Sequence, residues 1–101
     1  MDTKQRIIIK VRSMDENKIV DLKKLCTLYR KWSKKYCSHT PKLEIINLKH
    51  YGFDQQYLYV AHDMDYDGHN IMSGYDFINH IVDVIRKCSN DEHIKFWEGI
   101  L

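Results

Sequence analysis

The pattern of apolar and polar positions predicts alternating strands and helices, beginning with a strand near the N-terminus. Residues 6–12 are rich in β-branched side chains and alternate toward their end, which is typical of a strand. Successive strand side chains point to opposite faces, so one apolar face would carry Ile7, Ile9 and Val11. The opposite face would carry Ile8, Lys10 and Arg12.

Two longer segments have the apolar spacing of helices. The first can be capped by Ser13 or Asp15 and continues to about Tyr36. Its apolar positions recur at helical spacing and are Ile19, Leu22, Leu25, Cys26, Tyr29, Trp32 and Tyr36. The second helix begins after Ser73, whose spacing from Asp76 is that of a capping box, and ends near Cys88. It would bury Phe77, Ile78, Ile81, Val82 and Ile85.

The remaining apolar segments predict a hairpin and a final strand. Residues 43–50 and 56–62 are strand-like, and 51–54 between them suit a hairpin loop. Residues 93–101 fit a strand or a short helix, and we interpret them as a strand because this completes a recurrent order. That order is βαββαβ, the ferredoxin-like α+β fold, with a four-stranded antiparallel sheet and two helices on one face. The prediction is a single α+β domain over residues 1–101.

Composition and cysteine usage narrow the class of protein. With 44% hydrophobic and 30% charged residues, the chain has the balance of a globular domain. Its apolar runs are too short to cross a bilayer, and residues 1–6 are polar with no signal-peptide core behind them. We therefore expect a cytoplasmic protein with no membrane partner. The odd cysteine count fits a reducing compartment, with Cys26 and Cys88 buried on helices.

Positive charge is concentrated in the first half of the chain. Residues 1–53 hold 13 Lys/Arg and 5 Asp/Glu, a balance of +8, whereas residues 54–101 hold 3 and 9, a balance of −6. The first long helix carries much of this excess, and Arg30, Lys31 and Lys34 share one side of it. Such a helix face either is simply solvated or attracts an anionic partner such as nucleic acid.

A second candidate surface is the sheet face that the helices leave open. On the expected fold it would bring Lys10 and Arg12 beside Tyr57 and Tyr59, as stacked bases and their phosphates require. Tyr57-x-Tyr59 resembles the paired aromatics on the third strand of the RNA-recognition-motif family. The family's K/R-G-F/Y-G/A-F-V-x-F/Y signature is absent, because the corresponding residues 53–61 read FDQQYLYVA. The same face also suits a protein partner or a second copy of the chain.

An acidic loop is the third candidate. Asp63, Asp65 and Asp67, followed by Gly68, match the first half of an EF-hand calcium loop. Gly74 stands where the bidentate Glu of that motif would be, so the loop is either a Ca²⁺ site of another kind or an acidic turn. The flanking residues His62 and His69 favour a transition metal as an alternative.

These patterns favour binding over catalysis. The sequence has no phosphate-binding Gly-rich loop, nucleophile elbow or paired metal-binding histidines, so we expect no enzyme and no cofactor beyond a possible Ca²⁺. The leading hypothesis is a binding module for RNA or single-stranded DNA. The alternative is an accessory protein that inhibits a host protein or homodimerises. Many Ile, Lys and Tyr, with one Ala and one Pro, indicate an A+T-rich genome such as that of a phage or virus.

Overall fold

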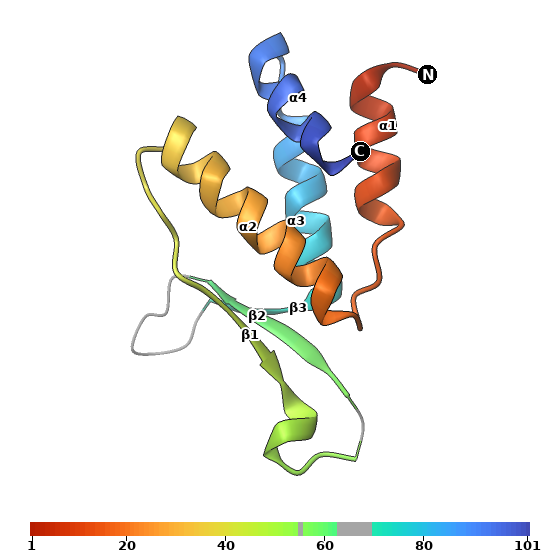
Figure 1. Cartoon of the computed structure of the whole chain (residues 1–101), viewed down its shortest axis with the longest axis vertical. Helices are drawn as coiled ribbons and strands as arrows, with labels where there is room; N and C mark the ends of the chain where they lie inside the picture. Colours follow the sequence, from red (N-terminus) through yellow and green to blue (C-terminus); the bar gives the residue numbers. More distant parts are fainter. Residues whose placement is uncertain (55, 63–69) are drawn as a thin grey trace.

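The computed structural model describes residues 1–54, 56–62 and 70–101, which form a helical layer and a small sheet (Figure 1). The helices are α1 (Thr3–Arg12), α2 (Ile19–Tyr36), α3 (Gly74–Arg86) and α4 (Asp91–Trp97). The strands are β1 (Leu43–Asn47), β2 (Leu58–His62) and β3 (Ile71–Ser73). Short 3₁₀ helices are η1 (Leu48–Tyr51) and η2 (Glu98–Ile100).

The N-terminal strand prediction is wrong, because residues 6–12 belong to helix α1. A complete capping box starts this helix: the Asp2 carboxylate accepts the Gln5 amide N–H at 2.8 Å, and Gln5 Oε1 accepts the Asp2 amide N–H at 3.2 Å. One helical turn apart, Ile7 and Val11 are both fully buried, and α1 packs mainly against α3. Helix capping and packing therefore outweigh the β propensity of Ile7, Ile8 and Ile9.

The C-terminal strand prediction is also wrong. Residues 91–97 form α4, and the Asn90 side chain caps it by accepting the amide N–H groups of Glu92 and His93 at 2.8 and 3.2 Å. Helical spacing turns Trp97 inward, where it is fully buried. The short-helix alternative for this segment is therefore the correct one.

The four-stranded ferredoxin-like sheet is contradicted by these two helices. Among the described residues, the sheet has three antiparallel strands in the order β1-β2-β3, and β3 was not predicted from the sequence. The fold remains mixed α and β. The architectural likeness to an RNA-recognition-motif domain disappears together with the fourth strand.

The predicted long helices and the hairpin are confirmed with shifted ends. Helix α2 ends at Tyr36 as predicted but begins at Ile19, after a turn in which the Asp15 carboxylate accepts the Asn17 amide N–H at 2.8 Å. Helix α3 begins after Ser73, whose hydroxyl oxygen accepts the Asp76 amide N–H at 3.1 Å. Strands β1 and β2 pair antiparallel, with Leu43 opposite His62.

The helices cover one face of the sheet. Leu58 and Val60 of β2 point into the core, so Tyr57 and Tyr59 lie on the opposite face. Tyr59 stands between Ile46 of β1 and Ser73 of β3 in the strand register. On this outer face Tyr59 is half-buried and Ala61 is only 2% exposed.

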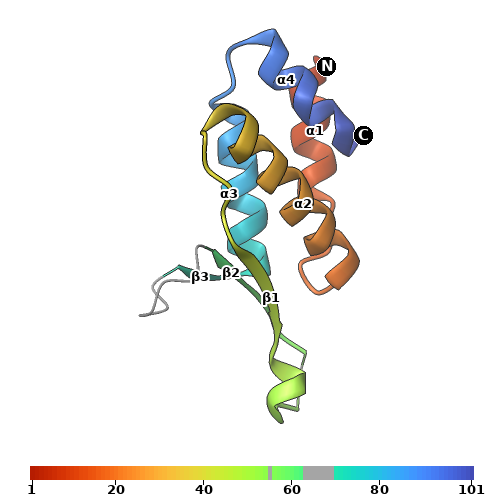
Figure 2. The ribbon, with the colours of Figure 1, turned by 60° about the vertical axis from the view of Figure 1, so that its left-hand side comes forward.

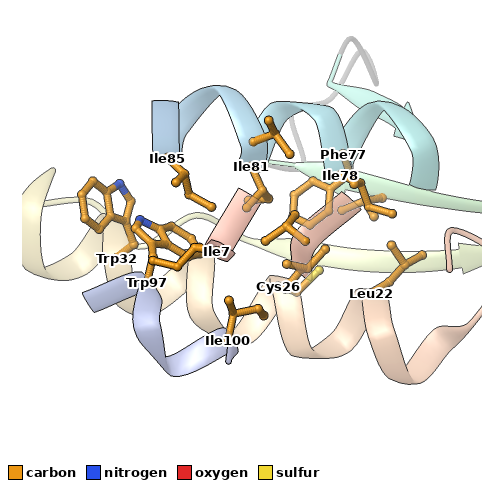
Figure 3. Close-up of a cluster of buried hydrophobic side chains, with 14 of the residues drawn as sticks. Ile7, Leu22, Cys26, Trp32, Phe77, Ile78, Ile81, Ile85, Trp97 and Ile100 are labelled. Atoms are coloured by element: carbon orange, nitrogen blue, oxygen red, sulfur yellow. The ribbon is translucent and has the colours of Figure 1, made fainter. Parts of the chain in front are cut away.

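Side chains from all four helices meet in one core, shown in Figure 3. Leu22 and Cys26 of α2 face Phe77 and Ile81 of α3, and Ile7 of α1 lies beside them (Figure 3). An aromatic group closes the end of this core between α2 and α4 and consists of Trp32, Tyr36, His93, Phe96 and Trp97. As predicted, Cys26 and Cys88 are buried as free thiols.

Across residues 1–54, 56–62 and 70–101, no helix has both the length and the apolar character that crossing a bilayer requires.

The start of α3 lies directly against the turn before α2. A Cβ atom added at Gly74 would lie 2.6 Å from the Glu16 carbonyl oxygen and 3.3 Å from Leu22 Cδ1. Because backbone cannot yield as a flexible side chain can, only glycine fits here without displacement. This close approach fixes the position of α3 relative to α2.

We therefore expect Gly74→Ala to lower the free energy of unfolding by about 1–3 kcal/mol, the usual cost of overpacking. Gly99→Ala is the matched control, because its new Cβ would meet nothing closer than Leu28 Cδ2 at 4.0 Å. The control should change stability by less than about 0.5 kcal/mol. Urea denaturation monitored by circular dichroism measures both values, and equal effects of the two substitutions would contradict the close packing.

Candidate functional site

The end of the β1–β2 hairpin extends beyond the helices. In Figures 1 and 2, η1 and the adjoining loop lie at one end of the molecule, away from all four helices. The resulting shape is elongated, with principal extents of 45 × 29 × 17 Å. The radius of gyration is 14.1 Å, larger than the value of about 13 Å for a compact domain of this length. The described residues 48–54, 56 and 57 therefore have no helical layer to pack against.

Three aromatic side chains are exposed on this projecting end. Tyr51, Phe53 and Tyr57 have 71%, 56% and 47% of their surface accessible, and we call them the aromatic tip. Gly52 separates the first two and ends η1 with a φ of 92°, a left-handed conformation that glycine adopts without strain. Lys49 and His50 are exposed on the same 3₁₀ helix. The tip therefore combines aromatic rings with a neighbouring positive charge.

A groove of about 420 Å³ lies between α2 and the edge strand β1. Its polar lining consists of Lys23, Thr27 and Arg30 from one side of α2 and Glu44 from β1, so cations outnumber the single carboxylate, and we call it the basic groove. Arg30 Nη2 donates a hydrogen bond to the Leu43 carbonyl oxygen at 3.2 Å. Alternate residues of an edge strand direct their backbone groups away from the neighbouring strand, so Arg30 satisfies a carbonyl that the sheet leaves unpaired.

Helix α2 is strongly positive along its solvent side. Its sequence contains six Lys/Arg and a single acidic residue, Asp21. The exposed cations outside the groove are Lys24, Lys31, Lys34 and Lys35. Among the described residues the one ion pair joins Arg86 to Asp83, so the α2 lysines keep their charge uncompensated by a salt bridge there. Uncompensated lysines on one helix create a positive potential toward solvent.

The structure separates the basic and aromatic residues that the sequence placed on one sheet face. Lys10 and Arg12 belong to α1, in the helical layer, whereas Tyr57 and Tyr59 lie on the outer sheet face. Figure 1 shows α1 at the opposite end of the molecule from the hairpin tip. Arg30, Lys31 and Lys34 lie on α2, as predicted, with Arg30 directed toward β1. The predicted cations of α2 therefore lie on a helix that packs against β1, whereas those of residues 6–12 lie on a helix that packs mainly against α3.

Two of the three residues of the aromatic tip were missed by sequence analysis, which had named only Tyr57. Tyr51 and Phe53 fall in a segment that was interpreted only as a hairpin loop. Two aromatic residues around a glycine in a loop are a usable signal, because a loop so short cannot bury both rings. What the sequence could not show is that the helices end before this part of the hairpin.

The predicted calcium loop, Asp63, Asp65 and Asp67, lies outside the described residues together with His69, so Ca²⁺ binding there stays a prediction. Its neighbour His62 is described, and it lies beside Tyr29 and His80. Within the described part of the chain, no three His, Cys, Asp or Glu side chains gather as a metal-binding group.

Burial changes the acidity of three groups near the helical core. It raises the pKa of the Cys26 thiol to about 11, although the nearby Arg30 partly offsets the effect. Burial also raises the pKa of Cys88, partly offset by Lys4. The pKa of His80 is lowered by burial first, then by the neighbouring His62 and Lys87, whereas Asp83 acts in the opposite direction. His80 is therefore neutral in the folded chain at neutral pH.

Comparison with known proteins gives no family for this chain. No protein-family model matches it, no curated protein matches its sequence, and no solved structure matches its fold. The functional argument therefore depends on the geometry of the chain itself.

The lowered pKa of His80 makes stability depend on pH. The unfolded chain takes up a proton at the ordinary histidine pKa, whereas the folded chain takes it up at lower pH. Stability should therefore decrease as pH falls below about 6.5 and level off once folded His80 is also protonated. Unfolding free energies from urea titrations over this range should show a shallower pH slope for His80→Gln.

His50→Gln is the control for this experiment, because His50 is exposed on η1. It should retain the pH slope of the wild type. If His80→Gln and the wild type have the same slope, folded His80 titrates as it does in the unfolded chain.

Proposed function

We propose that this chain is a non-catalytic binding module for an anionic partner, namely RNA or single-stranded DNA. The observation that carries the proposal is the projecting hairpin, which exposes Tyr51, Phe53 and Tyr57 beside Lys49 and whose strand β1 packs against the positive helix α2. Aromatic rings and cations are the two components with which proteins hold single strands without reading sequence.

The aromatic tip would supply the stacking contacts. Exposed rings cost free energy in water, and each ring that stacks on a base removes apolar surface from solvent on both partners. Such stacking contributes about 1–3 kcal/mol per base. The strands below the rings are joined by regular antiparallel pairing, which fixes the base of the hairpin before a ligand binds.

The basic groove and the outer side of α2 would hold the phosphates. Lys23 lies in the groove with Arg30, and Lys31 and Lys34 add charge along the same helix. Arg30 is already held by the Leu43 carbonyl, so its guanidinium is positioned before a ligand arrives. Gln56 Nε2 donates to the Asn17 carbonyl oxygen at 3.2 Å, which links the hairpin to the chain just before α2. This hydrogen bond is a direct contact between the hairpin loop and the segment that leads into α2.

We expect fluorescence anisotropy with a labelled oligothymidylate to detect binding at low salt. Removing the rings with Tyr51→Ala and Phe53→Ala together should weaken binding by about tenfold or more, from the loss of stacking. Tyr75→Ala is the matched control, since Tyr75 is 60% exposed but belongs to α3, away from the hairpin. A double substitution that binds as well as the wild type would exclude the tip as the stacking surface.

The electrostatic contribution of α2 to oligonucleotide binding is tested separately. Lys23→Ala with Lys31→Ala should weaken binding and make the slope of log affinity against log salt less negative by about 1–2, because fewer counterions are released. Lys10→Ala on α1 is the control and should leave the slope unchanged. If Lys10→Ala has the same effect as the α2 pair, a general positive potential rather than this surface determines binding.

A protein partner or a second copy of the chain is the other candidate. The outer sheet face supports it, since Ile71 is 50% exposed and stands opposite Ala61 beside Tyr59. Light scattering after size-exclusion chromatography at low and high salt distinguishes dimerisation through this face from nucleic-acid binding. A dimer that resists high salt would show that apolar contact of this face, rather than nucleic-acid binding, is its role.

A further inference from the structure

Three nitrogen and oxygen donors from separate elements converge beside the core. Tyr29 lies in α2, His62 ends β2 and His80 lies in α3. The Tyr29 hydroxyl oxygen is 3.3 Å from His62 Nε2 and 3.2 Å from His80 Nε2. These residues are 18 to 51 positions apart in the sequence, so only the packing of both helices on the sheet brings their polar atoms together.

Packing fixes the positions of these rings. The Tyr29 ring lies edge-on to Phe77 of the core, with centroids 6.1 Å apart. It also contacts the His80 ring at 5.4 Å and the His62 ring at 5.5 Å. The two imidazoles are 6.3 Å apart and inclined by 78°, so they converge on the phenol and do not stack. All three side chains are half-buried, which leaves the cluster partly accessible from solvent.

Two of the three spacings between these atoms are those of ligands around a tetrahedral zinc ion. A tetrahedral ion with bonds of about 2.0–2.1 Å separates its ligands by roughly 3.3 Å. The two nitrogen-to-oxygen distances, 3.3 and 3.2 Å, have this value.

We propose that Tyr29, His62 and His80 form a binding site for a zinc-class transition ion. Imidazole nitrogen is a preferred zinc ligand, and the phenol oxygen supplies the third donor where the described residues offer no additional His, Cys, Asp or Glu. On binding, the ion occupies the space between the three atoms in place of their hydrogen-bonded protons. The phenol proton leaves to solvent and no redox change occurs. The fourth position is left to water or another donor.

The same three atoms can also satisfy one another without a metal. The phenol O–H can donate to one imidazole nitrogen while its oxygen accepts the N–H of the other. Added zinc distinguishes the two alternatives. If the three atoms bind zinc, the ion raises the stability of the folded chain; if they form only a hydrogen-bonded network, it does not.

Isothermal titration of zinc chloride into the full, untagged chain is the direct test. The proposal predicts one ion per chain and a higher melting temperature in zinc than in a chelator. His62→Gln and His80→Gln should each weaken zinc binding by about tenfold or more, since each removes a ligand. His50→Gln and Cys37→Ser, both at exposed positions away from the cluster, should leave affinity unchanged.

Tyr29→Phe tests the phenol oxygen separately, because it keeps the ring that packs on Phe77. It should weaken zinc binding and alter the visible spectrum of the cobalt-substituted chain, which reports the ligands around the ion. Circular dichroism establishes that each variant is folded. If one of the two histidine variants does not fold, the other still tests the proposal. Absence of saturable zinc binding by the wild type overturns the proposal. Wild-type zinc affinity in both histidine variants also overturns it and leaves a hydrogen-bonded network.

Discussion

The hairpin extends further than the helical layer that covers the sheet, and this difference determines which side chains the molecule exposes. Helices α2 and α3 pack over one face of the sheet, and the core-facing residues of β2, Leu58 and Val60, lose nearly all contact with water. The hairpin continues past the last helix, so its end has strand pairing but no core (Figure 2). Apolar rings in that position cannot be buried within the chain, and their exposure favours an external partner.

The helical layer holds this geometry through contacts of several kinds. Gly74 lets α3 approach the turn before α2, and an aromatic group joins α2 to α4. The Lys4 ammonium donates to the carbonyl oxygens of Arg86 and Cys88, the latter at 2.8 Å, and so ties α1 to the C-terminal end of α3. Because α2 is fixed on its inner side, its lysines remain on a rigid outer surface next to β1.

Local sequence signals predicted the parts of the fold that are locally determined. The α2 apolar spacing, the Ser73 cap of α3 and the β1–β2 pairing all follow from residues close together in the chain. The predictions for the first and last segments were wrong. They relied on a β-branched run and on an ambiguous apolar pattern, whereas the capping groups of Asp2 and Asn90 start helices there. The basic helix of the candidate site was predictable, whereas the exposed tip and the Tyr29 cluster depend on contacts between distant segments.

The central claim is that the hairpin tip and the outer side of α2 act as one surface for a single strand of nucleic acid. An amide proton–nitrogen correlation spectrum, titrated with an oligonucleotide, tests it residue by residue. We expect the largest shift changes at the described residues of 48–57 and along the exposed side of α2, with α1 unaffected. Changes confined to α1, or a spectrum that does not change at low salt, would contradict the account.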